Sequence, residues 1–195
     1  MNLIARAWKL SILLALVFLA ACSQRSDPVA SSPQDRLAAR AQNVTIIRDD
    51  FGVPHIYAKT DADAVFGLLY AQAEDDFLRI ERNYIWATGR LAEVEGQQAI
   101  FSDLRARLYM TVDEAKAAYA SAPESLKALC DAYADGLNYY LATHPEVTPR
   151  LLTRFEPWMP MFFSEGSIGG DIESVPLEGI VDFYGKGDSS PGIDK

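Results

Sequence analysis

A long run of apolar residues at helical spacing between residues 61 and 89 constrains the fold more than any other feature of the sequence. The apolar positions recur every three or four residues, which places them on one face of a helix. They are Val65, Phe66, Leu69, Ala73, Phe77, Ile80 and Tyr84. Thr60 and Asp63 have the spacing of an acidic capping box at the start of this run, and Gly89 provides its stop. The pattern predicts one long helix with a buried face.

Two further helical segments follow. Thr111 and Glu114 fit a capping box, and Pro123 interrupts the helix that they begin. The helix restarts at once and carries an apolar stripe up to His144: Leu126, Leu129, Cys130, Tyr133, Leu137 and Leu141. We expect Cys130 to be a small buried hydrophobe on this helix. One more short helix, interrupted by Pro176, is expected within residues 171–184.

Before these helices, residues 44–58 read "VTIIRDDFGVPHIYA" and predict a short β-hairpin. Two β-prone arms flank a bend in which Asp and Gly tolerate tight dihedrals and Pro54 fixes φ. Long helices beside one small hairpin indicate an α+β chain that is mostly helical. A two-stranded hairpin is marginally stable alone. We therefore expect its strands to pair with a partner outside this sequence.

The first residues have the order of a bacterial secretory signal. Arg6 and Lys9 precede an apolar run over residues 10–21, which is shorter than the roughly 18–20 residues that span a bilayer. The run ends in Leu19-Ala20-Ala21-Cys22, which resembles a lipobox and predicts lipidation of Cys22. The alternative is an ordinary signal peptide cut nearby, with Cys22 incidental. Ser23 resembles an outer-membrane address, so we expect a periplasm-facing lipoprotein of a Gram-negative bacterium.

Composition then bounds the rest of the chain. Residues 23–42 are polar and rich in Ser, Pro and Gln, which predicts a flexible tether between the anchor and a body that starts near Asn43. Removing residues 1–22 takes away two cations and no anion, so the net charge falls from −9 to −11. This acidity argues against nucleic-acid binding. With two histidines and no Cys/His cluster, zinc and haem sites have no support.

Several charged residues near the hairpin are candidates for a site. The run Glu74-Asp75-Asp76 could suggest metal ligands, but adjacent positions on a helix point in different directions. We predict instead that Arg48, Arg79 and Arg82 pair with these acids. His55 is expected to make a polar contact within the hairpin rather than to act as a base.

A set of short motifs follows in fixed order along the chain. They are Arg48-Asp49, Phe51 to Ile56, Phe66-Gly67, Ala73-Glu74-Asp75 and Gly89 to Gly96, with "LCDAYADGLNYYL" and "FEPWMP" later. This ordered set resembles the penicillin acylase family over residues 43–184. The resemblance implies the α-chain region of an αββα N-terminal nucleophile hydrolase, with residues 185–195 as the start of a processed linker.

The resemblance also implies the chemistry. Such precursors cut themselves into an α and a β chain, and the new β-chain N-terminus, usually serine, attacks an amide carbonyl. A free α-amino group has a pKa of about 7.7–8.0 and can accept the hydroxyl proton without a histidine. Gly166-Ser167 is followed by Ile168 where the family has Asn. We therefore expect no catalytic residue within this chain, and no turnover by it alone.

The same resemblance suggests two sites. Met161, Phe162 and Phe163 lie in the stretch that lines the acyl pocket of relatives, with ordinary interchain core as the alternative. Asp171, with Glu173 two residues on, matches the position of an α-chain acid that helps hold a structural calcium ion. The alternative is an acid favoured at a helix N-terminus.

The predicted function is hydrolysis of a linear amide that joins an apolar acyl group to a polar amine. The resemblance leaves penicillin-type and N-acyl-homoserine-lactone-type substrates open. The expected partners are the β chain of the same precursor, the acyl amide and a lipid anchor in the outer membrane. The rival interpretation is a non-catalytic periplasmic lipoprotein that binds a partner, or a truncated fragment.

Overall fold

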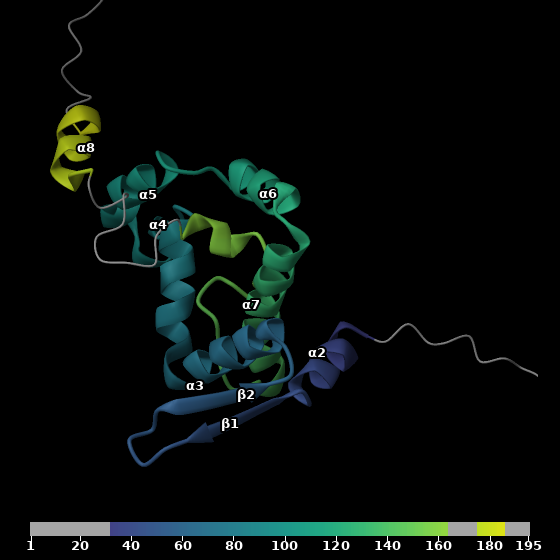
Figure 1. Cartoon of the computed structure of the whole chain (residues 1–195). Coiled ribbons are helices and arrows are strands. Elements are labelled where there is room, and N and C mark those ends of the chain that lie inside the picture. The colour runs from purple at the N-terminus through teal and green to yellow at the C-terminus, as the bar shows by residue number, and fades with distance from the viewer. Residues whose placement is uncertain (1–31, 164–174, 186–195) are drawn as a thin grey trace, which may run out of the picture. The chain divides into compact units, whose positions relative to one another are not determined.

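The computed structural model describes residues 32–163 and 175–185. Its elements belong to one unit that begins at Pro33 (Figure 1). In chain order they are α2 (Pro33–Ala41), β1 (Val44–Arg48), β2 (Pro54–Ala58), α3 (Asp61–Ala87), α4 (Ala92–Glu95), η1 (Gln97–Ala99), α5 (Ile100–Arg107), α6 (Val112–Ser121), α7 (Glu124–Thr143), η2 (Met159–Phe162) and α8 (Leu177–Tyr184). A mostly helical chain with a small antiparallel sheet confirms the predicted α+β class.

Helices α3 and α7 pack against each other and contribute most of the core. The predicted start and stop of α3 are both confirmed: the Thr60 hydroxyl accepts the Asp63 N–H at 3.1 Å, and Gly89 has φ +64° just past the end. Gly136 lies where the two helices approach closely. A Cβ at this position would lie 2.5 Å from the Phe66 carbonyl oxygen, so the crossing requires a glycine.

Helix α3 is kinked, which the periodicity does not predict. Asp76 has φ −162° and ψ 76°, outside the helical region. Its side-chain oxygen accepts the Arg79 N–H at 3.1 Å, in the manner of an N-cap residue three positions before the donor. The second half of α3 therefore begins as a new helix at Asp76, in a new direction.

The later helices follow the sequence signals closely. Thr111 and Glu114 form the predicted capping box at the start of α6, and α7 begins directly after Pro123. Cys130 is buried on α7, as predicted. Of the expected helix within residues 171–184, the structure describes α8, which starts after Pro176 and packs against α5. Residues 171–174 lie outside the described part.

The predicted flexible tether is wrong for residues 33–41, which form α2. This helix buries Leu37 against Phe66 and Ala132. The Arg40 guanidinium lies 2.8 Å from the Asp135 carboxylate and 3.4 Å from that of Asp63. These contacts are with residues far along the chain, which a local composition of Ser, Pro and Gln does not reveal. Residues 23–31 lie outside the described part.

The predicted hairpin is confirmed. β1 and β2 are antiparallel, with Val44 opposite Ala58 and Arg48 opposite Pro54. The inner face lies on α3 at Gly67, where a Cβ would meet Val44 at 2.6 Å. Within the described residues the sheet has these two strands. The expected pairing with an outside partner therefore stays a prediction.

Between residues 88 and 108 the chain forms α4, η1 and α5, which the sequence patterns did not predict. The buried Asp103 carboxylate of α5 accepts the Leu91 N–H at 2.7 Å and the Ala92 N–H at 2.9 Å.

Among the helices of the described ranges, none has the length and apolar character to cross a bilayer.

Candidate functional site

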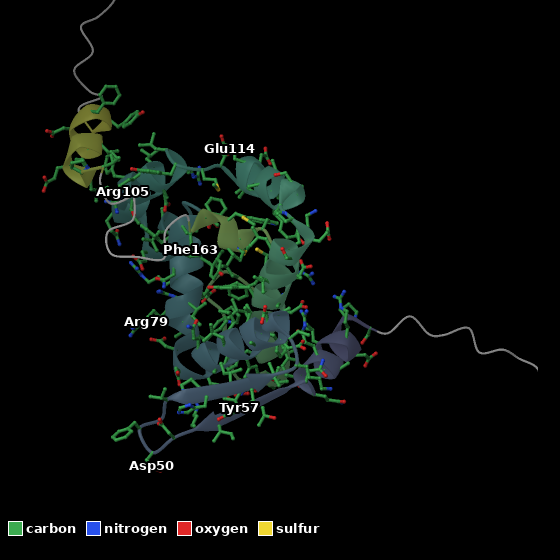
Figure 2. The ribbon with its side chains drawn as sticks, viewed as in Figure 1. Asp50, Tyr57, Arg79, Arg105, Glu114 and Phe163 are labelled. Atoms are coloured by element: carbon green, nitrogen blue, oxygen red, sulfur yellow. The ribbon has the colours of Figure 1, made fainter. Side chains whose placement is uncertain are left out.

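The three residues predicted to line an acyl pocket lie at the end of η2 and differ in burial. Figure 2 labels Phe163, the last of them. Phe162 is 5% exposed and packs in the core beside Ala87 and Ala115. Met161 is half-buried against the same cluster. Phe163 is 39% exposed and is the last residue of the described range 32–163. Phe162 is therefore part of the core, whereas the aromatic ring of Phe163 is exposed enough to contact a ligand.

Phe163 rests on a buried aromatic cluster. Its ring stands at 90° to the Tyr84 ring with the centroids 5.1 Å apart, and Tyr84 makes a similar edge contact with Phe155 at 5.3 Å. Edge-to-face pairs at this distance stabilise beyond the area they bury. The cluster thus fixes the back of the Phe163 ring while one side stays open.

The hydroxyl of Tyr84 is buried without a hydrogen-bond partner among the described residues. Burial raises the pKa of this hydroxyl well above its usual range, with a smaller contribution from Tyr133, whose ring is 6.1 Å from that of Tyr84. A phenol in this state stays protonated at any physiological pH. Tyr84 therefore serves as a neutral support for Phe163 and not as a base.

Glu81 holds the loop that leads to this aromatic segment. Its side chain is fully buried on α3, and its carboxylate accepts the backbone N–H groups of Arg150, Leu151 and Leu152 at 3.0, 2.7 and 2.9 Å. The sequence patterns did not single out this residue. A signal was present, because Glu81 lies four residues after Phe77 on the buried face of the helix.

Asn138 of α7 fixes the next part of the same loop. Its amide nitrogen donates to the Phe155 carbonyl at 2.8 Å, and its amide oxygen accepts the Phe155 N–H at 2.8 Å. A side-chain amide that satisfies both backbone groups of one residue sets that residue's position closely. Glu81 and Asn138 together place Phe155 and the start of η2 against α3 and α7.

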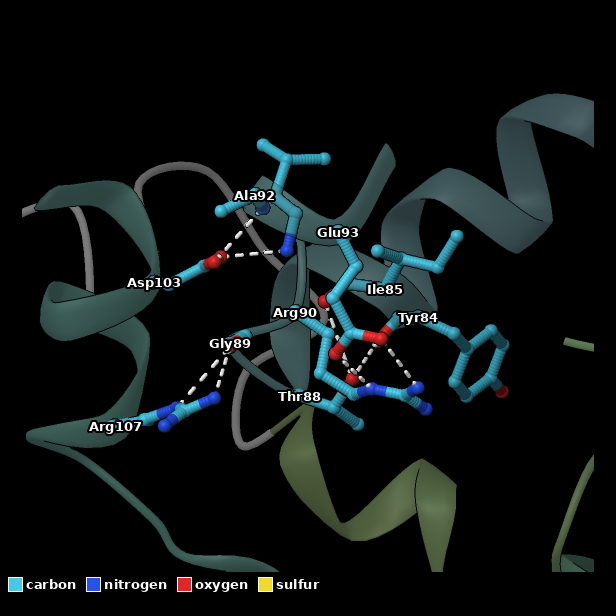
Figure 3. Close-up of polar contacts among 10 residues, drawn as sticks. Tyr84, Ile85, Thr88, Gly89, Arg90, Ala92, Glu93, Asp103 and Arg107 are labelled. Carbon is cyan, nitrogen blue, oxygen red and sulfur yellow. Dashed lines mark hydrogen bonds and ion pairs between the residues drawn. The ribbon is translucent and has the colours of Figure 1, made fainter. Parts of the chain in front are cut away.

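The "GRLAEVEG" stretch that follows α3 is stabilised by hydrogen bonds to backbone groups and by an ion pair between Arg90 and Glu93 at 2.7 Å (Figure 3). The Arg107 guanidinium donates to the Gly89 carbonyl at 2.8 and 3.1 Å, while Asp103 accepts two backbone N–H groups after Gly89. A Cβ at Gly89 would lie 2.8 Å from the Arg107 side chain. These residues form a structural turn beside the aromatic cluster.

Arg48 joins the hairpin to the middle of α3. Its guanidinium lies 3.1 Å from the Glu74 carboxylate and 2.9 Å from that of Asp75. It also donates to the carbonyls of Ala71 at 3.1 Å and Gly52 at 2.8 Å. The predicted pairing of Arg48 with the acidic run is confirmed, and this run is an anchor for the hairpin.

The other two arginines, Arg79 and Arg82, differ in whether they pair with the acidic run. Arg79 pairs with Asp76 at 2.9 Å, as predicted. The prediction for Arg82 is wrong, because its guanidinium lies 2.5 Å from Glu95 in α4. Arg82 lies six to eight residues beyond the acidic run on α3, and its side chain reaches the α4 segment instead.

A cleft of about 420 Å³ lies between α2, α7 and the loop before η2. Charged side chains of both signs line it, with Phe155 and Pro157 as apolar neighbours. Arg40 and Asp135 already pair across it, and Arg154 pairs with Glu156 at 2.8 Å. Burial raises the pKa of Asp135. The ion pair between Arg40 of α2 and Asp135 of α7 therefore helps to hold α2 against the core at this cleft.

The remaining predicted sites lie outside the described residues: Asp171 and Glu173 for calcium, and Cys22 for lipidation. Within residues 32–163 and 175–185, no group of three or more His, Cys, Asp or Glu side chains has the arrangement of a metal site. The calcium and lipid predictions therefore remain predictions.

Comparison with known proteins identifies the family. The model of the penicillin amidase family matches residues 43–174. Acyl-homoserine lactone acylase QuiP of Pseudomonas putida is 35% identical over 156 residues, covering 76% of this chain and 19% of that protein. Penicillin G acylase of Escherichia coli is 32% identical over 110 residues, covering 54% of this chain and 13% of the acylase.

A solved structure shares the fold. The thermostable penicillin G acylase of Alcaligenes faecalis matches with a TM-score of 0.57 and 23% identity, covering 74% of this chain and 86% of the matched chain. The chain spans about a fifth of the length of the first curated relative that it matches. The family model matches residues 43–174, which are most of this chain, and the motifs of the family occur in the expected order. The chain therefore belongs to the penicillin amidase family.

Proposed function

We propose that this chain is the α-chain portion of a self-processing acylase that hydrolyses a linear amide with an apolar acyl group. The match of residues 43–174 to the penicillin amidase family carries this proposal. The named relatives act on acyl-homoserine lactones and on penicillin G, and both substrates contain an acyl amide. The N-acyl-homoserine-lactone class is supported by the higher identity and wider coverage of the lactone acylase.

The contribution of this chain to the site would be the acyl pocket wall. Phe163 offers a half-open aromatic ring whose other side rests on Tyr84. An apolar acyl chain against this ring would lose contact with water and gain roughly 0.8 kcal/mol for each buried CH₂. Glu81 and Asn138 would act as positioning residues, since they hold the loop that carries the ring.

The attacking group would belong to the β chain of the same precursor. In the proposed step, the β-chain N-terminal serine hydroxyl attacks the amide carbonyl and its own α-amino group accepts the proton. The amine product leaves with a proton, and water then hydrolyses the acyl ester to return the free serine. No residue of the present chain takes part in bond making.

Expression of the full-length precursor tests self-processing. We expect the purified protein to run as two bands, and replacement of the serine at the Gly-Ser junction by alanine to leave one band. Continued splitting of that variant would contradict self-processing. A precursor that never splits and never hydrolyses an acyl amide would instead support the rival interpretation of a binding module.

The acyl pocket is tested by Phe163→Ala in the processed enzyme. We expect kcat/KM for long-chain acyl-homoserine lactones to fall about tenfold to a hundredfold, since the variant removes the apolar wall. The matched control is Leu126→Ala, because Leu126 is an exposed apolar side chain at the start of α7. Equal activity of Phe163→Ala and the control would overturn the assignment of the pocket wall.

A further proposal concerns calcium. If Asp171 holds calcium, Asp171→Asn and chelation should each lower the melting temperature of the processed protein, and their effects should not add.

Another proposal concerns the lipid anchor. If Cys22 is lipidated, labelled palmitate should enter the wild-type protein and not Cys22→Ser, and the wild-type protein should fractionate with the outer membrane. Label in the Cys22→Ser variant would exclude this anchor.

A further inference from the structure

The two edges of the hairpin differ in their backbone groups. The Asp49 N–H donates to the Val53 carbonyl at 3.2 Å, one step beyond the pair Arg48 and Pro54. Bonded and non-bonded pairs alternate along an antiparallel ladder. The pair Arg48 and Pro54 is therefore non-bonded, and the backbone groups of these residues point away from the partner strand.

The same alternation assigns the rest of the edge of β1. Val44 and Ile46 belong to the next non-bonded pairs, so their N–H and C=O groups also point outward. None of the hydrogen bonds among the described residues uses these outward groups of β1. An edge strand with a row of unpaired donors and acceptors is a template for another strand.

The outer edge of β2 is a poorer template. Its outward positions are Pro54, Ile56 and Ala58, and Pro54 has no N–H to donate. Proline at an edge position is a common means of blocking strand addition. The hairpin therefore offers one edge for pairing, and that edge is β1.

A groove lies beside β1 and would receive the side chains of an added strand. It has a volume of about 510 Å³. Its lining is mostly apolar and aromatic: Ala41, Val44, Ile46, Phe66, Gly67, Tyr70 and Tyr139, with Arg48 and Glu74. Alternate side chains of a strand point to one face. A strand paired with β1 would place every second side chain over this groove.

We propose that β1 pairs with an extended segment from the remaining part of the longer precursor, whose alternate apolar side chains fill the groove beside Tyr70 and Tyr139. The inference rests on the proposed function for the existence of that part. The named relative is about five times longer than the present chain, which supplies the length for such a segment. The outer face of the hairpin is also open to a further chain segment, since Ile47 is 54% exposed and Tyr57 is 61% exposed. Figure 2 shows Tyr57 on this face.

Hydrogen–deuterium exchange of the full-length protein, resolved to single amides by fragmentation, tests the edge directly. We expect the amides of Val44, Ile46 and Arg48 to exchange about a hundredfold more slowly than those of Ile56 and Ala58. Equal fast exchange at both edges would overturn the inference. Slow exchange at Ile56 and Ala58 alone would also overturn it, because it would place the partner on β2.

A matched pair of variants provides a second readout. Ile46 and Ile56 lie directly opposite each other, both half-buried on the inner face. Ile46→Pro and Ile56→Pro therefore remove the same side chain and an outward N–H, but from opposite edges. We expect Ile46→Pro to reduce the yield of assembled protein about tenfold relative to Ile56→Pro. Equal yields would contradict pairing at β1.

These results are distinguishable from failure of the proposed function. The exchange of edge amides can be measured in the unprocessed junction variant as well as in the processed protein. Fast exchange at β1 in a protein that still splits and hydrolyses an acyl amide would contradict the edge pairing and leave the proposed function intact. Slow exchange at β1 in a protein without any hydrolase activity would support the edge pairing and contradict the proposed acylase function.

Discussion

The α3–α7 core and the β1–β2 hairpin are stabilised in different ways. In the core, large side chains such as Tyr84, Ile85 and Leu137 are almost fully buried. In the hairpin, Phe51 and Tyr57 remain largely exposed, and the contacts with α3 depend on Gly67 and the Arg48 ion pairs. The core is therefore closed by this chain alone, whereas the hairpin keeps surface that another chain segment can cover.

The polar groups show the same contrast. Glu81 is buried in the core with three backbone N–H partners, so its removal leaves unpaired donors away from water. The hairpin pairs, such as Asp49 with His55 at 3.1 Å, are exposed, where water replaces a lost partner. Equivalent changes should therefore cost far more in the core than in the hairpin.

The largest effect is expected for Glu81→Ala. Loss of the carboxylate leaves three backbone donors without acceptors and should lower the free energy of unfolding by about 4 kcal/mol. Glu81→Gln should lose roughly half as much, since one oxygen can still serve Leu151 and Leu152. Urea denaturation of the full-length protein measures both. The control is the exposed Glu124→Ala, which should change stability by less than about 0.5 kcal/mol.

Gly136→Ala comes next, at the crossing of α3 and α7. The new Cβ would lie 2.5 Å from the Phe66 carbonyl oxygen, and backbone cannot yield as a side chain can. We expect a loss of about 3 kcal/mol, seen as a lower melting temperature. Gly179→Ala in α8 is the control, because nothing lies within 4 Å of its Cβ. That variant should be neutral or slightly stabilising; a similar loss in both would refute the packing argument.

Gly67→Ala tests the hairpin side of the comparison. Its Cβ would meet Val44 at 2.6 Å and Ile56 at 2.9 Å, and both contacts are with side-chain atoms that can move. We expect a smaller loss of about 1 kcal/mol. Hydrogen exchange should become faster in β1 and β2 while α7 keeps its protection. Faster exchange in α7 as well would mean that the hairpin and core unfold together.

The smallest effect concerns acid. The hydrogen bond from His55 lowers the pKa of Asp49 from its ordinary 3.8, with help from the Val53 N–H. A depressed folded pKa contributes stability above the ordinary value, and this contribution is lost as pH falls through the folded value. We expect the Val53 amide to exchange faster only below about pH 4, after correction for intrinsic rates.

Asp49→Asn should remove this pH dependence, because the amide does not titrate. The matched control is Asp50→Asn at the tip of the hairpin, which should keep the dependence (Figure 2). If Asp50→Asn abolished it and Asp49→Asn did not, the assignment to Asp49 would be wrong. The core amides of α3 and α7 should not change in either variant.

The helices α3, α6 and α7 were predictable because their signals are local. The apolar spacing from Phe66 to Tyr84, the Thr111 and Glu114 capping box and the stop at Gly89 all act within a few residues of chain. The hairpin was predictable for the same reason, from the bend before Pro54. The resemblance of the motifs to one family added the expected function, which composition alone does not give.

The candidate site was predicted only in part. The sequence singled out Met161, Phe162 and Phe163 together, but it could not separate the buried Phe162 from the half-open Phe163. The roles of Glu81 and Asn138 also went unnoticed, because their partners lie far away along the chain.

The sequence by itself therefore determined where α3, α6 and α7 begin and end, where the hairpin turns, and the family to which the chain belongs. The tertiary structure alone decided that residues 33–41 form a packed helix, that α3 kinks at Asp76, and that Arg82 faces Glu95. The physical reason is the separation along the chain between the residues that interact. Capping and periodicity depend on neighbours within one or two turns, whereas burial and ion pairing depend on which distant residues the fold brings together.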